Sequence, residues 1–167
     1  YEGVMQLGIA TDSQDADGEV IAEKPVPLLT EADLETVLAK FRGDLQQIPP
    51  MVSAIKHQGT PLYKLARKGQ TVEREPRLVH IYDLRMLKLE LPHVHLRVAC
   101  SKGTYVRTLC HDIGEILGCG AHLAGLRRTR SGRFDVKDAK PLDELLQLKR
   151  EQLQPLVIPI LKLLQLT

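Results

Sequence analysis

The segment that most constrains this chain is Cys100–Arg107, because it joins a strand pattern directly to a helix pattern. Before it, residues 93–100 alternate apolar and polar side chains, which predicts a half-buried strand. After it, apolar residues recur every three or four positions as far as Gly118, which predicts a helix that ends there. The four residues 101–104 are therefore predicted to form a tight turn from strand to helix.

The side chains of this turn have functional potential. Either Ser101 or Thr104 is expected to cap the helix. Free backbone N–H groups at a helix start, together with Lys102, suit an anion such as a phosphate. Tyr105 and Arg107 would then project from the first helical turn beside that site. The alternative is a purely structural capped helix, a common arrangement.

Composition places the chain among soluble globular proteins, with 43% hydrophobic and 26% charged residues in a length of 167. Its three cysteines form no CxxC pair, which favours reduced thiols and a cytoplasmic location. No apolar run is long enough to span a bilayer. The chain begins at Tyr1 inside a strand-like pattern, so we expect it to be truncated at its N-terminal side.

Positive charge is concentrated in two segments, as expected for a protein that binds a polyanion such as nucleic acid. Residues 51–75 hold a predicted short helix from Leu62 to Lys68, bounded by Gly and Pro, whose outer face is basic. Its cations are Lys64, Arg67 and Lys68. The second segment, residues 97–133, ends in its densest basic run, with Arg127, Arg128, Arg130 and Arg133, which can bind phosphates bidentately. A solvated basic face is the alternative for both.

Simple patterns predict the remaining elements. A capping-box start at Thr30 predicts a helix that is stopped at Gly43. Residues 78–100 read as a hairpin turned at Pro92, with either a bulge or a strand break near Asp83. Two strands are predicted at residues 1–9 and 19–26, and a short amphipathic helix at residues 141–150.

Several stretches resemble one family in a single register. Residues 101–108, Ser-Lys-Gly-Thr-Tyr-Val-Arg-Thr, resemble the bacterial tRNA pseudouridine-55 synthases, the TruB family. The same holds for residues 117–123 with Leu126-Arg127-Arg128, for residues 7–18, and for residues 41–56. The resemblance extends from residue 1 to about residue 134.

The resemblance implies isomerisation of uridine to pseudouridine in the T-loop of tRNA, with no metal or organic cofactor. It implies a monomer in the cytoplasm that binds the T-arm and needs no obligatory protein partner. Three residues would be catalytic: Tyr1, Tyr105 and Arg107. Three would bind the substrate: Asp15, Lys102 and Leu126. The RNA backbone would be bound by Lys64, Arg67, Lys68, Arg127, Arg128 and Arg130.

The family's nucleophilic aspartate belongs to a Gly-x-Leu-Asp motif upstream of the position matching Tyr1, and no such motif occurs in these 167 residues. We therefore expect this chain alone to be inactive. Two alternatives follow from the residues. One is a non-catalytic RNA-binding or tRNA-folding module. The other is a metal-stabilised domain built on Cys119 and His122.

The predicted fold class is α/β (α+β), with a mixed, mainly antiparallel sheet flanked by helices, similar to pseudouridine synthases and truncated at the N-terminal side. We expect residues 1–167 to form a partial catalytic domain. Within it, residues 51–75 would be an insertion that clamps RNA, and residues 140–167 would close along the sheet.

Overall fold

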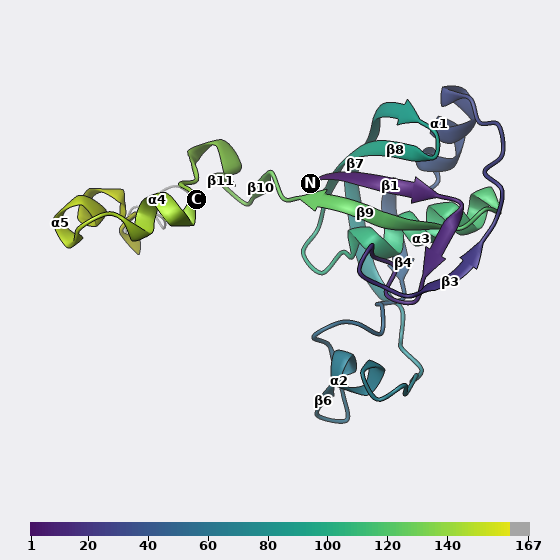
Figure 1. Ribbon diagram of the computed structural model, residues 1–167, viewed down its shortest axis with the longest axis horizontal. Helices are drawn as coiled ribbons and strands as arrows, with labels where there is room; N and C mark the ends of the chain where they lie inside the picture. The colour runs from purple at the N-terminus through teal and green to yellow at the C-terminus, as the bar shows by residue number, and fades with distance from the viewer. Residues whose placement is uncertain (161–167) are drawn as a thin grey trace. The chain divides into compact units, whose positions relative to one another are not determined.

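The computed structural model describes residues 1–160 and forms two compact units, Tyr1–Arg128 and a second that begins at Thr129 (Figure 1). The large unit is built on a five-stranded sheet of order β4-β7-β8-β1-β9, in which every neighbouring pair is antiparallel. These strands are β1 (Glu2–Leu7), β4 (Gly43–Gln47), β7 (Arg77–Glu90), β8 (His93–Cys100) and β9 (Ala121–Arg127).

Three small ladders accompany the sheet. They pair β2 (Ile9–Thr11) with β3 (Val20–Glu23), β5 (Lys56–His57) with β6 (Thr60–Pro61), and β10 (Arg130–Ser131) with β11 (Phe134–Asp135). A single parallel bridge joins Asp15 to Leu123. The predicted fold class, a mainly antiparallel sheet flanked by helices, is confirmed, and among the described residues the bridge from Asp15 to Leu123 is the one parallel pairing.

The hairpin predicted for residues 78–100 is confirmed, and β7 is one long strand rather than two. Its register against β8 shifts between Ile81 and Asp83, close to the predicted phase change, and again between Met86 and Lys88. Each bulge moves one residue out of the ladder and re-aims the side chains that follow. Leu84 can therefore be fully buried even though it breaks the alternation set by Val79 and Ile81.

Two helices pack on one face of this sheet, α1 (Glu31–Ala39) and α3 (Val106–Leu117). In α3 the apolar stripe is buried, with Leu109, Cys110 and Ile113 at most 1% exposed. These residues form one hydrophobic cluster with the inward side chains of β1, β7 and β8. Figure 1 shows α3 running along β9, and the two elements are in contact. The helix ends at Gly118, whose left-handed φ of 80° suits a residue without Cβ.

Helix α1 has the predicted capping box, since Thr30 and Asp33 bond to each other's backbone N–H groups. The prediction that Gly43 stops this helix is wrong. The helix ends at Ala39, and Gly43, with φ of 91°, is the first residue of β4. Strand β4 was not predicted, because Leu45 is the only apolar residue among its five.

The predicted insertion leaves the sheet after β4 and returns at β7. It contains the β5–β6 hairpin and α2 (Leu62–Ala66), a shorter helix than predicted, followed by Gly69 in the left-handed region. Leu62 is 2% exposed and anchors the helix. Its N–H donates to the Ile55 carbonyl at 2.7 Å, and the Tyr63 N–H donates to the Ser53 carbonyl at 3.0 Å.

From Thr129 to Ile160 no side chain is buried. This unit holds the β10–β11 hairpin, α4 (Leu142–Leu146), α5 (Arg150–Leu153) and two short 3-10 turns, Val136–Asp138 and Gln154–Leu156. A helix within 141–150 is thus confirmed. That residues 140–167 close along the sheet stays a prediction, and residues 161–167 lie outside the described part. None of the helices within residues 1–160 has the length and apolar character needed to cross a bilayer.

Candidate functional site

The turn before α3 is built differently from the prediction. Neither Ser101 nor Thr104 caps the helix. The N-cap residue is Tyr105, which has an extended backbone conformation and makes no side-chain capping bond. The Thr104 hydroxyl donates to the Ser101 carbonyl at 3.0 Å, and the Ser101 hydroxyl accepts the His80 N–H at 2.9 Å. The turn is thereby fastened to β7 instead of to the helix. Lys102 lies exposed at its tip.

Tyr105 and Arg107 come together at the start of α3. The guanidinium carbon of Arg107 lies 5.7 Å from the centroid of the Tyr105 ring, a cation–π arrangement. The Arg107 guanidinium also donates a hydrogen bond to the Val52 carbonyl, at the beginning of the insertion. An arginine held in this way keeps a permanent positive charge beside an aromatic face.

Tyr1 and Leu126 lie on the helix-covered side of the sheet. Tyr1 pairs with Val98 through two backbone hydrogen bonds, of 2.8 and 2.9 Å, and its side chain packs against the hydrophobic cluster that also contains Val106. Leu126 pairs with Gly3, two residues along β1 from Tyr1. Because strand side chains alternate, both face the same side as buried Met5. Leu126 remains 49% exposed and accessible to a ligand.

The loop that carries Asp15 is fastened to β9 and α3. The Ala16 N–H donates to the Leu123 carbonyl, the Leu123 N–H donates to the Gln14 carbonyl, and the Thr108 hydroxyl donates to the Gln14 side chain at 2.7 Å. Asp15 therefore lies against α3, one turn beyond Arg107. No ion pair joins its carboxylate to a cation within residues 1–160. Burial, and to a lesser degree this carboxylate, raises the pKa of Cys110 to about 12.

The predicted RNA-binding cations lie on separate elements. Lys64, Arg67 and Lys68 are exposed on and just after α2, with the Arg67 guanidinium carbon 5.5 Å from the Tyr63 ring centroid. Arg127 ends β9 in the large unit, and the exposed side chain of Arg128 follows it. Arg130 belongs to the second unit, in β10.

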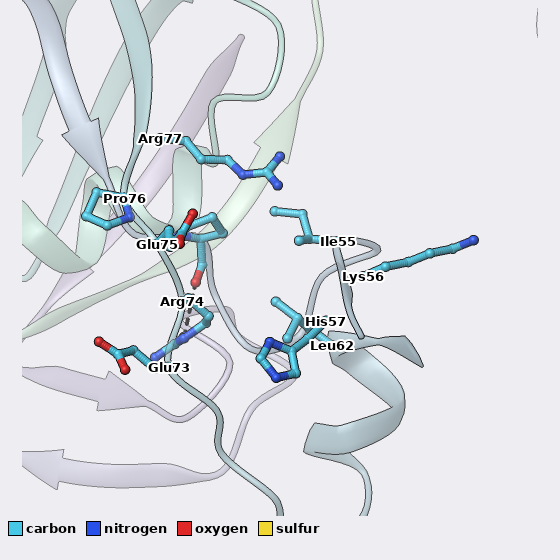
Figure 2. A pocket seen from close by; sticks show the side chains of 10 residues that line it. Ile55, Lys56, His57, Leu62, Glu73, Arg74, Glu75, Pro76 and Arg77 are labelled. Atoms are coloured by element: carbon cyan, nitrogen blue, oxygen red, sulfur yellow. Dashed lines mark hydrogen bonds between the residues drawn. The ribbon is translucent and has the colours of Figure 1, made fainter. Parts of the chain in front are cut away.

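A pocket of about 420 Å³ lies at the base of the insertion, and Figure 2 shows the side chains that line it. Arg77 extends toward Ile55 across it, whereas Lys56 points away. Arg74 donates to the Pro49 carbonyl at 3.0 Å and so joins the outgoing and returning connections of the insertion. The full lining is Pro49, Ile55, Lys56, His57, Leu62, Glu73, Arg74, Glu75, Pro76 and Arg77.

Sequence reasoning missed Gln47, the last residue of β4. It is 4% exposed, and its side-chain amide bonds to both backbone polar groups of Tyr105. The partners lie 58 positions apart, so no local pattern could reveal them.

The metal alternative gains no support from the described part of the chain, which contains no group of three or more His, Cys, Asp or Glu side chains placed to hold an ion. Cys119 is 3% exposed, and the His122 ring nitrogen Nδ1 lies 3.0 Å from the Ile9 carbonyl oxygen.

Comparison with known proteins gives matches over nearly the whole chain. The TruB family pseudouridylate synthase N-terminal domain matches residues 1–106, and the tRNA pseudouridylate synthase B C-terminal domain matches residues 107–165. The tRNA pseudouridine synthase B of Opitutus terrae is 51% identical over 160 residues, 96% of this chain and 66% of that protein. That of Francisella philomiragia is 55% identical over 153 residues, 91% of this chain and 51% of that protein. The chain thus spans about half to two thirds of the length of these relatives.

Solved structures agree with this result. A crystal structure of a Cbf5-Nop10-Gar1 complex superimposes with a TM-score of 0.62 at 30% identity, covering 87% of this chain and 34% of that one. An H/ACA RNP bound to a substrate RNA containing 2′-deoxyuridine gives a TM-score of 0.57 at 25% identity, covering 87% of this chain and 32% of that one. The family predicted from the motifs is confirmed, and the chain belongs to the TruB family of pseudouridylate synthases.

Proposed function

We propose that these residues form the base pocket and RNA-binding surface of an isomerase that converts uridine to pseudouridine at position 55, in the T-loop of tRNA. The observation that carries the proposal is the meeting of Tyr105 and Arg107 at the start of α3. The named relatives, tRNA pseudouridine synthases B, support the choice of tRNA as substrate.

The reaction breaks the bond between uracil N1 and the sugar, turns the base and forms a new bond from carbon 5. Carbon 5 loses its proton, and N1 regains one. The base must leave the RNA stack to enter a pocket. The chemistry requires a carboxylate nucleophile, a cation that keeps this carboxylate ionised, and an aromatic face for the base.

Each of these roles except the nucleophile has a candidate among the described residues. Arg107 supplies the cation, because a nearby guanidinium favours the charged form of a carboxylate. Tyr1 offers a ring for stacking and a hydroxyl to accept the carbon-5 proton, and Tyr105 lines the same pocket. Asp15, Lys102 and Leu126 are the proposed substrate contacts.

The nucleophile is not among these candidates. The carboxylates of Asp12, Asp15, Asp17 and Asp112 match no catalytic position of the family, and the sequence contains no Gly-x-Leu-Asp motif. We therefore expect the 167 residues alone to bind tRNA without turning it over. The second candidate function is a non-catalytic RNA-binding module, and it predicts the same binding without turnover. The exposed cations of the insertion favour this candidate.

RNA would be held by its phosphates. The insertion, residues 51–75, is proposed to clamp the T-arm, while Arg127, Arg128 and Arg130 bind the backbone. The protein would act as a monomer in the cytoplasm, with no obligatory protein partner.

The test is tritium release from tRNA labelled at carbon 5 of uracil, on protein whose intact mass has been measured. The 167-residue chain should bind tRNA in a salt-sensitive manner and release no tritium. A chimera carrying, before Tyr1, the segment that precedes the matching position in the Opitutus terrae relative should release it. Release by the 167 residues alone would contradict the nucleophile assignment, and failure to bind tRNA would overturn the proposal.

Arg107→Ala in the chimera separates chemistry from binding. Turnover should be lost while tRNA binding remains within about twofold, because Arg107 is not among the cations proposed to bind the RNA phosphates, which supply most of the affinity. Arg85→Ala is the matched control, since the Arg85 side chain is 70% exposed and pairs with Asp83. Undiminished turnover of the Arg107 variant would remove that residue from the site.

A further inference from the structure

Gln47 lies at the point where β4 ends and the insertion begins. Its backbone pairs with Arg77 at the edge of the sheet, and its side chain leaves the sheet to reach Tyr105. Two residues later the chain enters the Pro49-Pro50 pair and continues to Val52. A side chain here can therefore connect the sheet, the insertion and the start of α3.

The Gln47 side chain binds the Tyr105 backbone as a neighbouring strand would. Its Oε1 accepts the Tyr105 N–H at 2.8 Å, and its Nε2 donates to the Tyr105 carbonyl at 3.1 Å. A primary amide offers a donor and an acceptor side by side, the combination that a peptide group also presents. At 4% exposure the amide is shielded from water, so an unpaired polar atom there would be costly.

The bonds from Gln47 to Tyr105 are not capping bonds of the helix. Tyr105 is the cap residue of α3 and has no side-chain capping bond of its own. Its carbonyl already accepts the Leu109 N–H at 3.1 Å, the first bond of the helix. The bonds from Gln47 are thus additional to the helix and fix the peptide units on both sides of the Tyr105 Cα.

Arg107 is attached to the same segment, because its guanidinium donates to the Val52 carbonyl. Residues 47–52 therefore contact residues 105–107 at both ends, once through Gln47 and once through Arg107. The conformation at the start of the insertion and the orientation of the two proposed catalytic side chains are consequently linked.

We propose that Gln47 is a positioning residue, whose buried side-chain amide fixes the Tyr105 backbone and thereby orients Tyr105 and Arg107 in the base pocket. The catalytic consequence rests on the proposed function. The fixing of the Tyr105 backbone does not, and it can be tested separately.

The direct test is amide hydrogen exchange followed by NMR on the 167-residue protein. In Gln47→Met, which keeps the side-chain length but can neither donate nor accept, the Tyr105 amide should exchange about tenfold faster. The Leu109 and Ile113 amides should keep their rates, which distinguishes a local release from general destabilisation. Gln46→Met is the matched control, since Gln46 is the exposed neighbour on the same strand.

Gln47→Glu, studied at a pH low enough to protonate the carboxyl, keeps one donor and one acceptor, so the Tyr105 amide should stay protected there even if the methionine variant folds poorly. Unchanged Tyr105 exchange in a folded Gln47→Met variant would overturn the proposal. So would loss of protection in Gln47→Glu with the Leu109 amide still protected.

The catalytic consequence is read in the chimera, where Gln47→Met should lower kcat about tenfold or more and leave KM within about twofold. A faster Tyr105 exchange with unchanged kcat would overturn the catalytic role of Gln47. If wild-type protein binds no tRNA, the proposed function fails, and the exchange rates still decide whether Gln47 fixes Tyr105.

Discussion

At the scale of single residues, the three free cysteines differ in depth although all lie in the large unit. Cys110 is fully buried on the inner stripe of α3, and Cys119 is 3% exposed. Burial raises the pKa of the half-buried Cys100 thiol, while a weaker bond from Thr104 lowers it. For Cys110 burial is again the first cause and the Asp15 carboxylate the second, which brings its pKa to about 12. Both thiols are thus kept protonated at neutral pH.

We therefore expect at most one thiol per native chain to react with iodoacetamide at pH 8, and only slowly. That thiol is Cys100, and Cys100→Ser should abolish the reaction. In concentrated urea Cys110 and Cys119 should also become reactive, because unfolding exposes both buried side chains to the reagent. Mass spectrometry of the labelled protein measures this. Fast labelling of Cys110 in native protein would contradict its burial against the sheet.

At the scale of elements, sequence patterns predicted what depends on neighbours in the chain. Three such features are contained within a few consecutive residues: the apolar stripe of α3, the alternation of β8 and the capping box at Thr30. Edge strand β4 has one apolar side chain and so no such repeat. The backbone of Tyr105, the cap residue of α3, is held by the Gln47 side chain, and such long-range partners become visible only in three dimensions.

The packing of α3 against the turn before β9 requires a glycine in the middle of the helix. A Cβ at Gly114 would lie 2.3 Å from the backbone nitrogen of Ala121 and 2.5 Å from the carbonyl carbon of Gly120. The Gly120 N–H donates to the Gly114 carbonyl at 3.0 Å, so the two segments cannot separate without losing this bond. The turn therefore approaches the helix as closely as backbone atoms allow.

Gly114→Ala should destabilise the protein by about 2 kcal/mol, although alanine is the better helix former by about 1 kcal/mol. The reason is that the new methyl group meets backbone rather than a movable side chain. Urea unfolding measures the change. Gly125→Ala is the control, because a Cβ there would meet nothing closer than Val4 at 3.9 Å. Equal or higher stability of the Gly114 variant would contradict the close approach.

At the scale of the whole molecule, the net charge of +2 does not show which cations are free to bind RNA phosphates. Arg85, Lys88 and Lys140 each pair with a nearby carboxylate, of Asp83, Glu90 and Glu144 respectively. Lys64, Arg67 and Lys68 form no ion pair within residues 1–160, and all three are exposed. Charge that is not neutralised by the protein itself is the charge that can replace counterions on RNA phosphates.

Replacing Lys64, Arg67 and Lys68 together by alanine should therefore reduce the steepness with which tRNA affinity falls with salt. Each lost phosphate contact reduces the steepness of log K against log salt by about 0.7–0.9, so the expected reduction for three contacts is about 2–3. Filter binding of tRNA between low and moderate salt measures it. Replacing Arg85, Lys88 and Lys140 removes the same charge from paired positions and should leave the slope nearly unchanged. Equal reductions in the two triple variants would mean that net charge alone attracts the RNA, and that the insertion does not contact it.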